Sequence, residues 1–183
     1  MEKLRGKRVV LRPVSAGDRP LLQRWLGDRE LRKCTGRRLS ILAGARASIP
    51  PRDAQFLILV RENEHPIGLC GLFGISDNGT AEVGIVLGER DTWGRGYGPE
   101  ALRLLLDHAY LDLGLAQVSL CVHTANTRAI RAYAKVGFVT EQRLTVGRWL
   151  FGRGVEVLIM TSLSSTSAET ATREAERCSA LRG

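Results

Sequence analysis

The sequence predicts a single α/β domain with a mixed, mostly antiparallel central sheet flanked by helices. Short apolar segments with strand spacing recur along the chain, turn-forming tetrapeptides join several of them, and helical patterns separate the later ones. Turns of this kind make antiparallel pairs, whereas a helix between strands makes a crossover connection. The chain has 183 residues, of which 44% are hydrophobic and 25% charged, as expected for one soluble domain.

The first third of the chain predicts one strand and then one or two helices. A strand is expected over residues 8–14, which are rich in valine and alternate in polarity. Residues 16–34 place leucines and Trp25 at helical spacing, and Asp18 precedes them as a plausible N-cap. Residues 35–53 contain glycines and prolines and are predicted to be irregular.

Three strands linked by hairpin turns are expected next, at residues 55–61, 66–75 and 80–88. The tetrapeptides ENEH and SDNG lie between them and are typical of turns. These strands therefore predict the antiparallel part of the sheet.

The later part of the chain predicts helical crossovers. A helix over about 96–113 precedes a strand at 116–124. A second helix is expected over 126–136, capped by Asn126 and ended by Gly137. The segments GFVTEQRL and WLFGRGVEVLIMTSL predict two closing strands. We expect the domain to span residues 1–163, followed by a polar tail over residues 164–183.

Composition excludes several classes of protein. No apolar run approaches the roughly 18 residues that a membrane span needs. The N-terminus carries charges but no apolar signal core, so a cytoplasmic location is expected. The histidines lack metal-ligand spacing, and no C-x-x-C pair occurs, so neither a metal site nor a disulfide framework is predicted. The four scattered cysteines are Cys34, Cys70, Cys121 and Cys178.

The net charge of +8 is concentrated in the first third of the chain. Residues 1–52 hold 14 basic and 4 acidic residues, whereas residues 53–163 hold 10 and 12. Such a basic segment would attract RNA or an RNA-rich particle, so nucleic-acid contact is one interpretation. A basic face without a partner, or one that only assists a polyanionic ligand, is the other.

A glycine-rich stretch lies directly before the long helix. Gly94, Gly96 and Gly98 alternate with other residues, and Pro99 and Glu100 suit a first helical turn. Glycines there let main-chain N–H groups approach a ligand closely, and the helix dipole favours an anion. A phosphate group is the expected ligand, although many turns of this kind bind nothing. Neither a Walker A loop nor a G-x-G-x-x-G dinucleotide motif is present.

Two motifs carry a resemblance to a known family. The segment Trp93-Gly-Arg-Gly-Tyr-Gly98 resembles the acyl-CoA pyrophosphate loop, [QR]-x-x-G-x-[GA], of the GNAT superfamily of N-acyltransferases. Residues 126–138, NTRAIRAYAKVGF, resemble its later N-x-x-A-x-x-x-Y-x-K-x-G-F signature. The likeness spans about residues 8–163. Tryptophan replaces the usual Gln or Arg at position 93, which resembles the branch that acetylates ribosomal-protein N-termini (alanine included) and some antibiotics.

The resemblance implies that acetyl-CoA is the acyl donor and that an amine is the acceptor. The acceptor would be the N-terminus of a ribosomal or other protein, or a small-molecule amine. The pantetheine arm would lie along the strand before the loop, with the N–H of Val86 polarising the thioester carbonyl. Alternatively, Val86 is an ordinary residue of the β-ladder without a role in catalysis. Arg95 is alternatively a solvated surface arginine that does not contact the coenzyme. The residues expected to bind the coenzyme are Val86, Leu87, Gly94, Arg95, Gly96, Tyr97, Gly98 and Asn126.

Two side chains are candidate proton carriers. Glu82 lies eleven residues before Trp93, which resembles the spacing of the catalytic glutamate in the histone-acetylating branch, and this resemblance implies that Glu82 would deprotonate the amine. Strand alternation places it on the face of Gly84 and Val86, and a salt bridge to an N-terminal arginine is the alternative. By resemblance, Tyr133 would protonate the leaving thiolate. Alternatively, Tyr133 is an aromatic residue of the core with a structural role. Asn126 would contact the pantetheine arm or serve as a plain N-cap. His123 is a weaker second candidate for the base.

The sequence therefore predicts an acetyl-CoA-dependent N-acetyltransferase that uses direct attack of an amine on the thioester. One rival hypothesis is an enzyme specialised for antibiotic or metabolite amines. A rival of another class is a non-catalytic acyl-CoA-binding module that docks on RNA or a ribosome through its basic segment.

Overall fold

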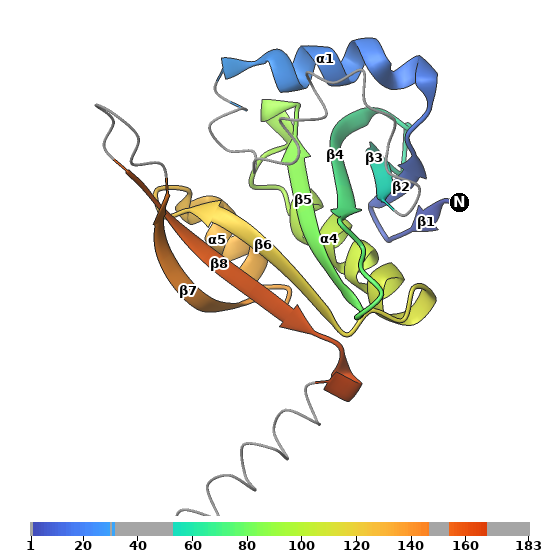
Figure 1. Cartoon of the computed structure of the whole chain (residues 1–183). Helices are drawn as coiled ribbons and strands as arrows, with labels where there is room; N and C mark the ends of the chain where they lie inside the picture. The colour runs from blue at the N-terminus through green and yellow to red at the C-terminus, as the bar shows by residue number, and fades with distance from the viewer. Residues whose placement is uncertain (1, 30, 32–52, 147–153, 168–183) are drawn as a thin grey trace, which may run out of the picture.

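The computed structural model describes residues 2–29, 31, 53–146 and 154–167. These residues form one eight-stranded sheet in the order β1-β2-β3-β4-β5-β6-β8-β7, and every neighbouring pair is antiparallel except β5 and β6 (Figure 1). The predicted mixed, mostly antiparallel sheet is confirmed. Its strands are β1 Leu4–Arg5, β2 Val9–Pro13, β3 Ala54–Val60, β4 Pro66–Phe73, β5 Thr80–Leu87, β6 Gln117–His123, β7 Val139–Val146 and β8 Val155–Leu163.

Helices cover the sheet on both faces. The helical segments are η1 Ala16–Asp18, α1 Arg19–Gly27, η2 Arg90–Thr92, α4 Tyr97–Asp107, the π-helical turn η3 His108–Asp112 and α5 Thr127–Ala134. Apolar residues of α4 and α5 pack with Val83 and Val118 in one core, whereas Trp25 of α1 packs with Leu69 and Val86 in a second. Figure 1 shows α1 above the strands and α4 behind them. The two cores occupy opposite faces because side chains alternate along each strand.

The parallel pair β5–β6 is short, and this determines where a ligand can enter. The two strands pair only from Thr80↔Gln117 to Glu82↔Ser119. Beyond Glu82, β5 stays paired with β4 as far as Leu87, while β6 diverges from it (Figure 1). The edge of β5 that faces β6 is therefore open over its carboxyl half. Carboxyl ends of strands are where open α/β sheets place their ligands.

Helix α5 follows the sequence prediction closely. The Asn126 side-chain oxygen accepts a hydrogen bond from the N–H of Ala129 at 3.2 Å, which confirms the predicted cap. Gly137, with φ of +98°, follows the end of the helix as expected.

The structure confirms Asp18 as the N-cap residue of α1, but its side chain does not cap the helix. Asp18 precedes α1 directly, but its carboxylate makes no hydrogen bond to the N–H groups of that helix. It accepts instead from Ser15 and from both terminal nitrogens of the Arg12 guanidinium, at 3.0 and 2.6 Å. The hydrogen bonds from Arg12 lower the pKa of Asp18 to about 2. A charged partner on β2 and the preceding turn thus hold this carboxylate away from the N–H groups of α1.

Other predictions need adjustment. The helix expected over 96–113 is α-helical only to Asp107, because its last turn widens into the π-helical turn, where Leu113 donates to His108 O. The two-residue strand β1 was not predicted. The irregular segment expected at 35–53 lies, apart from Asp53, outside the described residues, as does the polar tail beyond Ser167. No helix in the described ranges is long and apolar enough to span a membrane.

Candidate functional site

The glycine-rich loop has a main-chain conformation suited to an anion. Gly94 and Gly96 have φ of +76° and +86°, a left-handed conformation that other residues adopt at a cost. A chain that alternates between right- and left-handed residues points successive N–H groups toward one concavity. Gly96 is also the N-cap residue of α4, so the positive end of that helix dipole adds to the field. The loop supplies donors and positive potential without any side chain.

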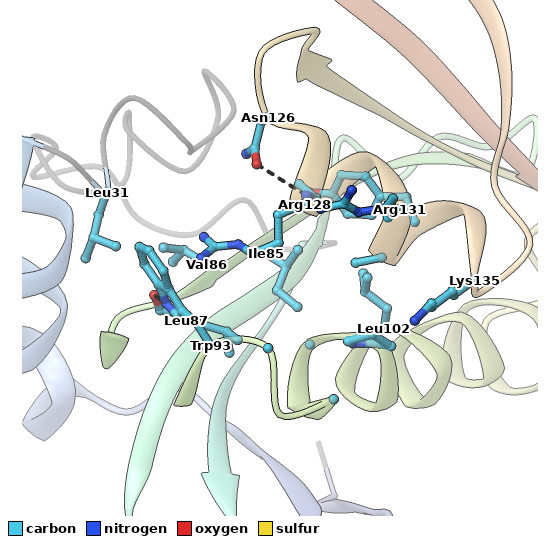
Figure 2. A pocket seen from close by; sticks show the side chains of 17 residues that line it. Leu31, Ile85, Val86, Leu87, Trp93, Leu102, Asn126, Arg128, Arg131 and Lys135 are labelled. Carbon is cyan, nitrogen blue, oxygen red and sulfur yellow. Dashed lines mark hydrogen bonds between the residues drawn. The ribbon is translucent and has the colours of Figure 1, made fainter. Parts of the chain in front are cut away.

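A cavity of about 270 Å³ lies beside this loop, between the open edge of β5 and helix α5 (Figure 2). It brings together the loop glycines, the β5 edge and the later sequence signature. Seven of the predicted site residues line it: Val86, Leu87, Gly94, Gly96, Gly98, Asn126 and Tyr133.

Three predicted site residues lie elsewhere. Arg95 is exposed on the loop, and its carbonyl accepts a hydrogen bond from Arg8 at 2.7 Å. Tyr97 begins α4, and its ring lies 4.5 Å from the Arg8 guanidinium carbon. Glu82 is half-buried at the point where β5 and β6 separate. None of these three contributes to the wall of the cavity.

The hydrogen-bonding pattern of β4 and β5 decides which residues face the open edge. The Gly88 N–H donates to Ile67 O at 2.8 Å, so positions 67 and 88 form a hydrogen-bonded pair. Such pairs alternate along an antiparallel ladder, which makes Leu69↔Val86 the next one. The main-chain groups of Val86 therefore point toward β4, and those of Leu87 toward the open edge. This register contradicts the expectation that the Val86 N–H faces a coenzyme, although Val86 still lines the cavity.

Tyr133 lies in the wall formed by α5. Its side chain is buried, with a residue exposure of 9%, and its ring meets Phe138 edge to face at a centroid distance of 5.9 Å. Asn126 lies two helical turns before it and also lines the cavity. The structure therefore places Asn126 and Tyr133, the asparagine and tyrosine of the later sequence signature, on the same side of α5, as their seven-residue spacing predicts.

Three basic side chains of the cavity wall were missed by the sequence reasoning. Arg128, Arg131 and Lys135 line the cavity together with Tyr133 (Figure 2). Their spacing of three and four residues places them on one face of α5, so the signal was present in the NTRAIRAYAK segment. They give the α5 wall a positive charge suited to a polyanion.

Trp93 is a further residue whose role the sequence did not show. Its indole N–H donates to Leu87 O at 3.0 Å, which agrees with a Leu87 carbonyl that faces the open edge. The Arg128 guanidinium carbon lies 3.6 Å from the centroid of the Trp93 ring. Trp93 therefore links the end of β5 to α5 through a cation–π contact.

Comparison with known proteins identifies the family. The sequence profile of the acetyltransferase (GNAT) domain matches residues 8–139. The chain belongs to the GNAT acetyltransferase family. It is 30% identical over 173 residues to an uncharacterized N-acetyltransferase, p20, of Bacillus licheniformis, across 89% of this chain and 97% of that protein.

Solved structures of GNAT proteins have the same fold. A spermidine N-acetyltransferase from Vibrio cholerae in complex with CoA and spermine superposes with a TM-score of 0.75 at 22% identity, over 89% of this chain and 99% of that one. A GNAT-family acetyltransferase from Bacillus anthracis gives 0.72 at 15% identity, over 88% and 98%. This GNAT protein is an acetyl-CoA-dependent N-acetyltransferase that transfers an acetyl group to an amine. A non-catalytic binding module is not favoured.

The second face of the sheet carries the candidate base of this GNAT enzyme. Glu82 shares a face of β5 with Val86, which packs in the core of α1. Cys121 and His123 of β6 also lie on this second face, because the alternate residues of β6 pack in the core that contains α4 and α5. Partial burial, followed by the charge of Glu82, raises the pKa of the Cys121 thiol, so the thiolate is disfavoured. Within the described ranges, no three His, Cys, Asp or Glu residues are grouped to hold a metal ion.

Proposed function

We propose that this GNAT enzyme binds the pyrophosphate of acetyl-CoA on residues 94–98 and the pantetheine arm along the open edge of β5. The supporting observation is that the left-handed glycines, the edge of β5 and Tyr133 meet at one cavity. The pyrophosphate faces the loop N–H groups, and the basic residues of α5 neutralise further charge on the coenzyme. The arm then pairs with β5 where β6 has diverged, as an added strand would.

The chemistry follows from the placement of the donors and the proton carriers. The thioester carbonyl accepts a hydrogen bond from one outward-facing main-chain N–H of β5, that of Ile85 or that of Leu87, since both face the open edge by the alternation described above. The amine attacks from the face that carries Glu82, and Glu82 removes a proton from it. Tyr133 donates a proton to the departing CoA thiolate. The acetyl group passes directly from sulfur to nitrogen, so no enzyme nucleophile is required.

The role of Glu82 is tested by the pH dependence of turnover. Replacing Glu82→Gln removes the base, so the fall in rate toward acidic pH should flatten and the maximal rate should drop by about 100-fold. Cys121→Ser serves as the control, because it changes a neighbouring side chain of the same face without removing a base. A Glu82→Gln enzyme with an unchanged rate and pH profile would assign the proton transfer to another group, with His123 as the next candidate.

The basic residues in and after α1 bear on which amine this enzyme acetylates. Residues 31–52, which follow α1, hold six basic and no acidic residues. On α1 itself, Arg19 and Arg24 are exposed. A polycation approaching these basic residues meets like charge, which costs both association rate and affinity. The acceptor class proposed here is therefore a protein N-terminus, such as that of a ribosomal protein, or a small amine of low positive charge.

A thiol-release assay with acetyl-CoA distinguishes the acceptor classes. Candidate acceptors are peptides with free N-termini, amino acids, aminoglycosides and spermidine, each measured at low and at high salt. Turnover should be faster with peptides than with spermidine, and the acceptor KM of the best peptide should rise with salt. Fast, salt-insensitive acetylation of spermidine or an aminoglycoside would replace this acceptor class with a polyamine or antibiotic amine.

A further inference from the structure

Arg8 connects the first hairpin of the chain to the glycine-rich loop. Its guanidinium Nη1 donates to Arg95 O at 2.7 Å, and its Cζ lies 4.5 Å from the Tyr97 ring centroid. Its main-chain N–H donates to Glu100 Oε1 at 2.7 Å, and the N–H of Val9 donates to the same oxygen at 3.2 Å. Residues more than 85 positions apart in sequence are thus joined at the start of α4.

The hydrogen bond to Arg95 O fixes one peptide group of the loop. In a planar trans peptide the carbonyl and the following N–H point in opposite directions. Gly96 lines the cavity, whereas Arg8 and Arg95 do not. With the Arg95 carbonyl held toward Arg8, the Gly96 N–H is directed to the opposite side, toward the cavity. Because glycine tolerates either sign of φ, this peptide would otherwise rotate at little cost.

Arg8 also brings charge close to the loop. Its Nη1 atom lies 3.5 Å from the position that a Cβ on Gly96 would occupy. The partners that the structure gives its guanidinium are a carbonyl and an aromatic ring, and neither neutralises a positive charge. The guanidinium therefore contributes positive potential behind the N–H groups of residues 94–98.

We propose that Arg8 is a positioning residue for the pyrophosphate of acetyl-CoA. It acts through the loop: it orients the peptide between Arg95 and Gly96, so that an N–H group faces the anion before the coenzyme arrives. Preorganised donors bind more tightly because less ordering is needed on binding. The proposal rests on the function proposed above for residues 94–98.

The test uses three acetyl donors: acetyl-CoA, its 3′-dephospho form, which keeps the pyrophosphate, and S-acetylpantetheine, which lacks the pyrophosphate and the adenosine. Dissociation constants are measured by calorimetry on the full chain. Arg8→Ala should weaken binding of the first two by the same factor, about tenfold, and leave S-acetylpantetheine unchanged. Arg8→Gln retains a hydrogen-bond donor and should recover part of the loss. Arg5→Ala, which removes the same charge from the same hairpin, should bind all three as wild type does.

Each contrary result has a distinct meaning. Equal weakening of S-acetylpantetheine would overturn the proposal, because Arg8 would then support the fold in general. A loss confined to acetyl-CoA would also overturn it, since Arg8 would then contact the 3′-phosphate directly. Wild-type affinity in folded Arg8→Ala protein would overturn it as well. If the loop itself does not hold the pyrophosphate, folded Gly96→Asp protein will bind acetyl-CoA as the wild type does, which is a separate readout.

Discussion

The two walls of the cavity are built in different ways. The wall formed by the loop and the end of β5 presents main-chain groups, and its conformation depends on glycine at positions 94 and 96. The wall formed by α5 presents side chains, among them Arg128 and Tyr133. The loop therefore depends on backbone geometry imposed by its neighbours, whereas α5 depends on an intrinsically regular helix that displays residues at fixed spacing.

The support behind the two walls differs as well. The loop wall is held from outside by contacts with distant segments: Arg8 binds the Arg95 carbonyl, and the Trp25 indole of α1 donates to Glu89 just before the loop. Helix α5 is held by its own cap at Asn126 and by the packing of residues such as Phe138. A single change in the loop wall should therefore disturb several donors at once, whereas a single change on α5 should remove only one contribution.

Gly96→Asp is expected to have the largest effect, with acetyl-CoA binding weakened more than about tenfold. The left-handed φ of +86° disfavours the new residue, and its carboxylate repels the pyrophosphate. The new Cβ would lie 3.5 Å from Arg8 Nη1, so the carboxylate also competes for that guanidinium.

Calorimetry on folded protein measures this loss of affinity. Gly114→Asp is a matched control, because Gly114 also has a positive φ, of +65°, but does not line the cavity. Wild-type affinity in the Gly96→Asp protein would show that the loop does not hold the pyrophosphate.

Tyr133→Phe should act on turnover while leaving coenzyme affinity almost unchanged. The lost hydroxyl matters when the thiolate leaves, so kcat should fall by at least about tenfold at constant Kd for acetyl-CoA. Steady-state rates combined with calorimetry separate the two quantities. Tyr110→Phe removes a hydroxyl outside the cavity and should leave kcat unchanged. A Tyr133→Phe enzyme with full kcat at every pH would remove the tyrosine from the proposed mechanism.

Arg128→Ala should have a smaller effect, because it removes one of several cations and one cation–π contact. The Kd for acetyl-CoA should rise about three- to fivefold, with a change in tryptophan emission as the Trp93 ring loses its partner. Arg143→Ala on the exposed strand β7 is the control for loss of charge. Tighter binding by Arg128→Ala would mean that the stacked pair obstructs the cavity, which would reverse the role given to this wall.

Asp18→Asn should leave coenzyme binding unchanged, since Asp18 belongs to neither wall. Its pKa is lowered to about 2, so its ionised form stabilises the fold at pH above its unfolded value of about 4. That stabilisation is lost as pH falls toward 2. Thermal melts should show a lower Tm for the variant near neutral pH, and the difference should shrink between pH 4 and pH 2. A change in acetyl-CoA affinity would show that the β2–α1 junction is coupled to the site.

The sequence by itself determined the features that depend on neighbouring residues. The order of strands and helices, the cap at Asn126 and the loop glycines follow from patterns a few residues long. The placement of Asn126 and Tyr133 on one side of α5 also follows, because helical spacing is fixed by local geometry. The row of basic residues on α5 belongs to the same class, and helical spacing alone would have identified it.

Tertiary structure decided the features that depend on pairing between distant segments. The register of β5 against β4, with Leu69 opposite Val86 and the N–H of Gly88 donating to Ile67 O, decides which residues of β5 face the open edge. A Cβ on Gly88 would lie 2.3 Å from the Trp25 ring, so the packing of α1 leaves no room for a side chain at this position. Whether Val86 or Leu87 presents its N–H to the cavity could not be predicted from β5 alone, because a shift of one residue reverses the answer. The contact between Arg8 and the loop likewise exists only once β2 and α4 pack together, since no local pattern relates residues so far apart in sequence.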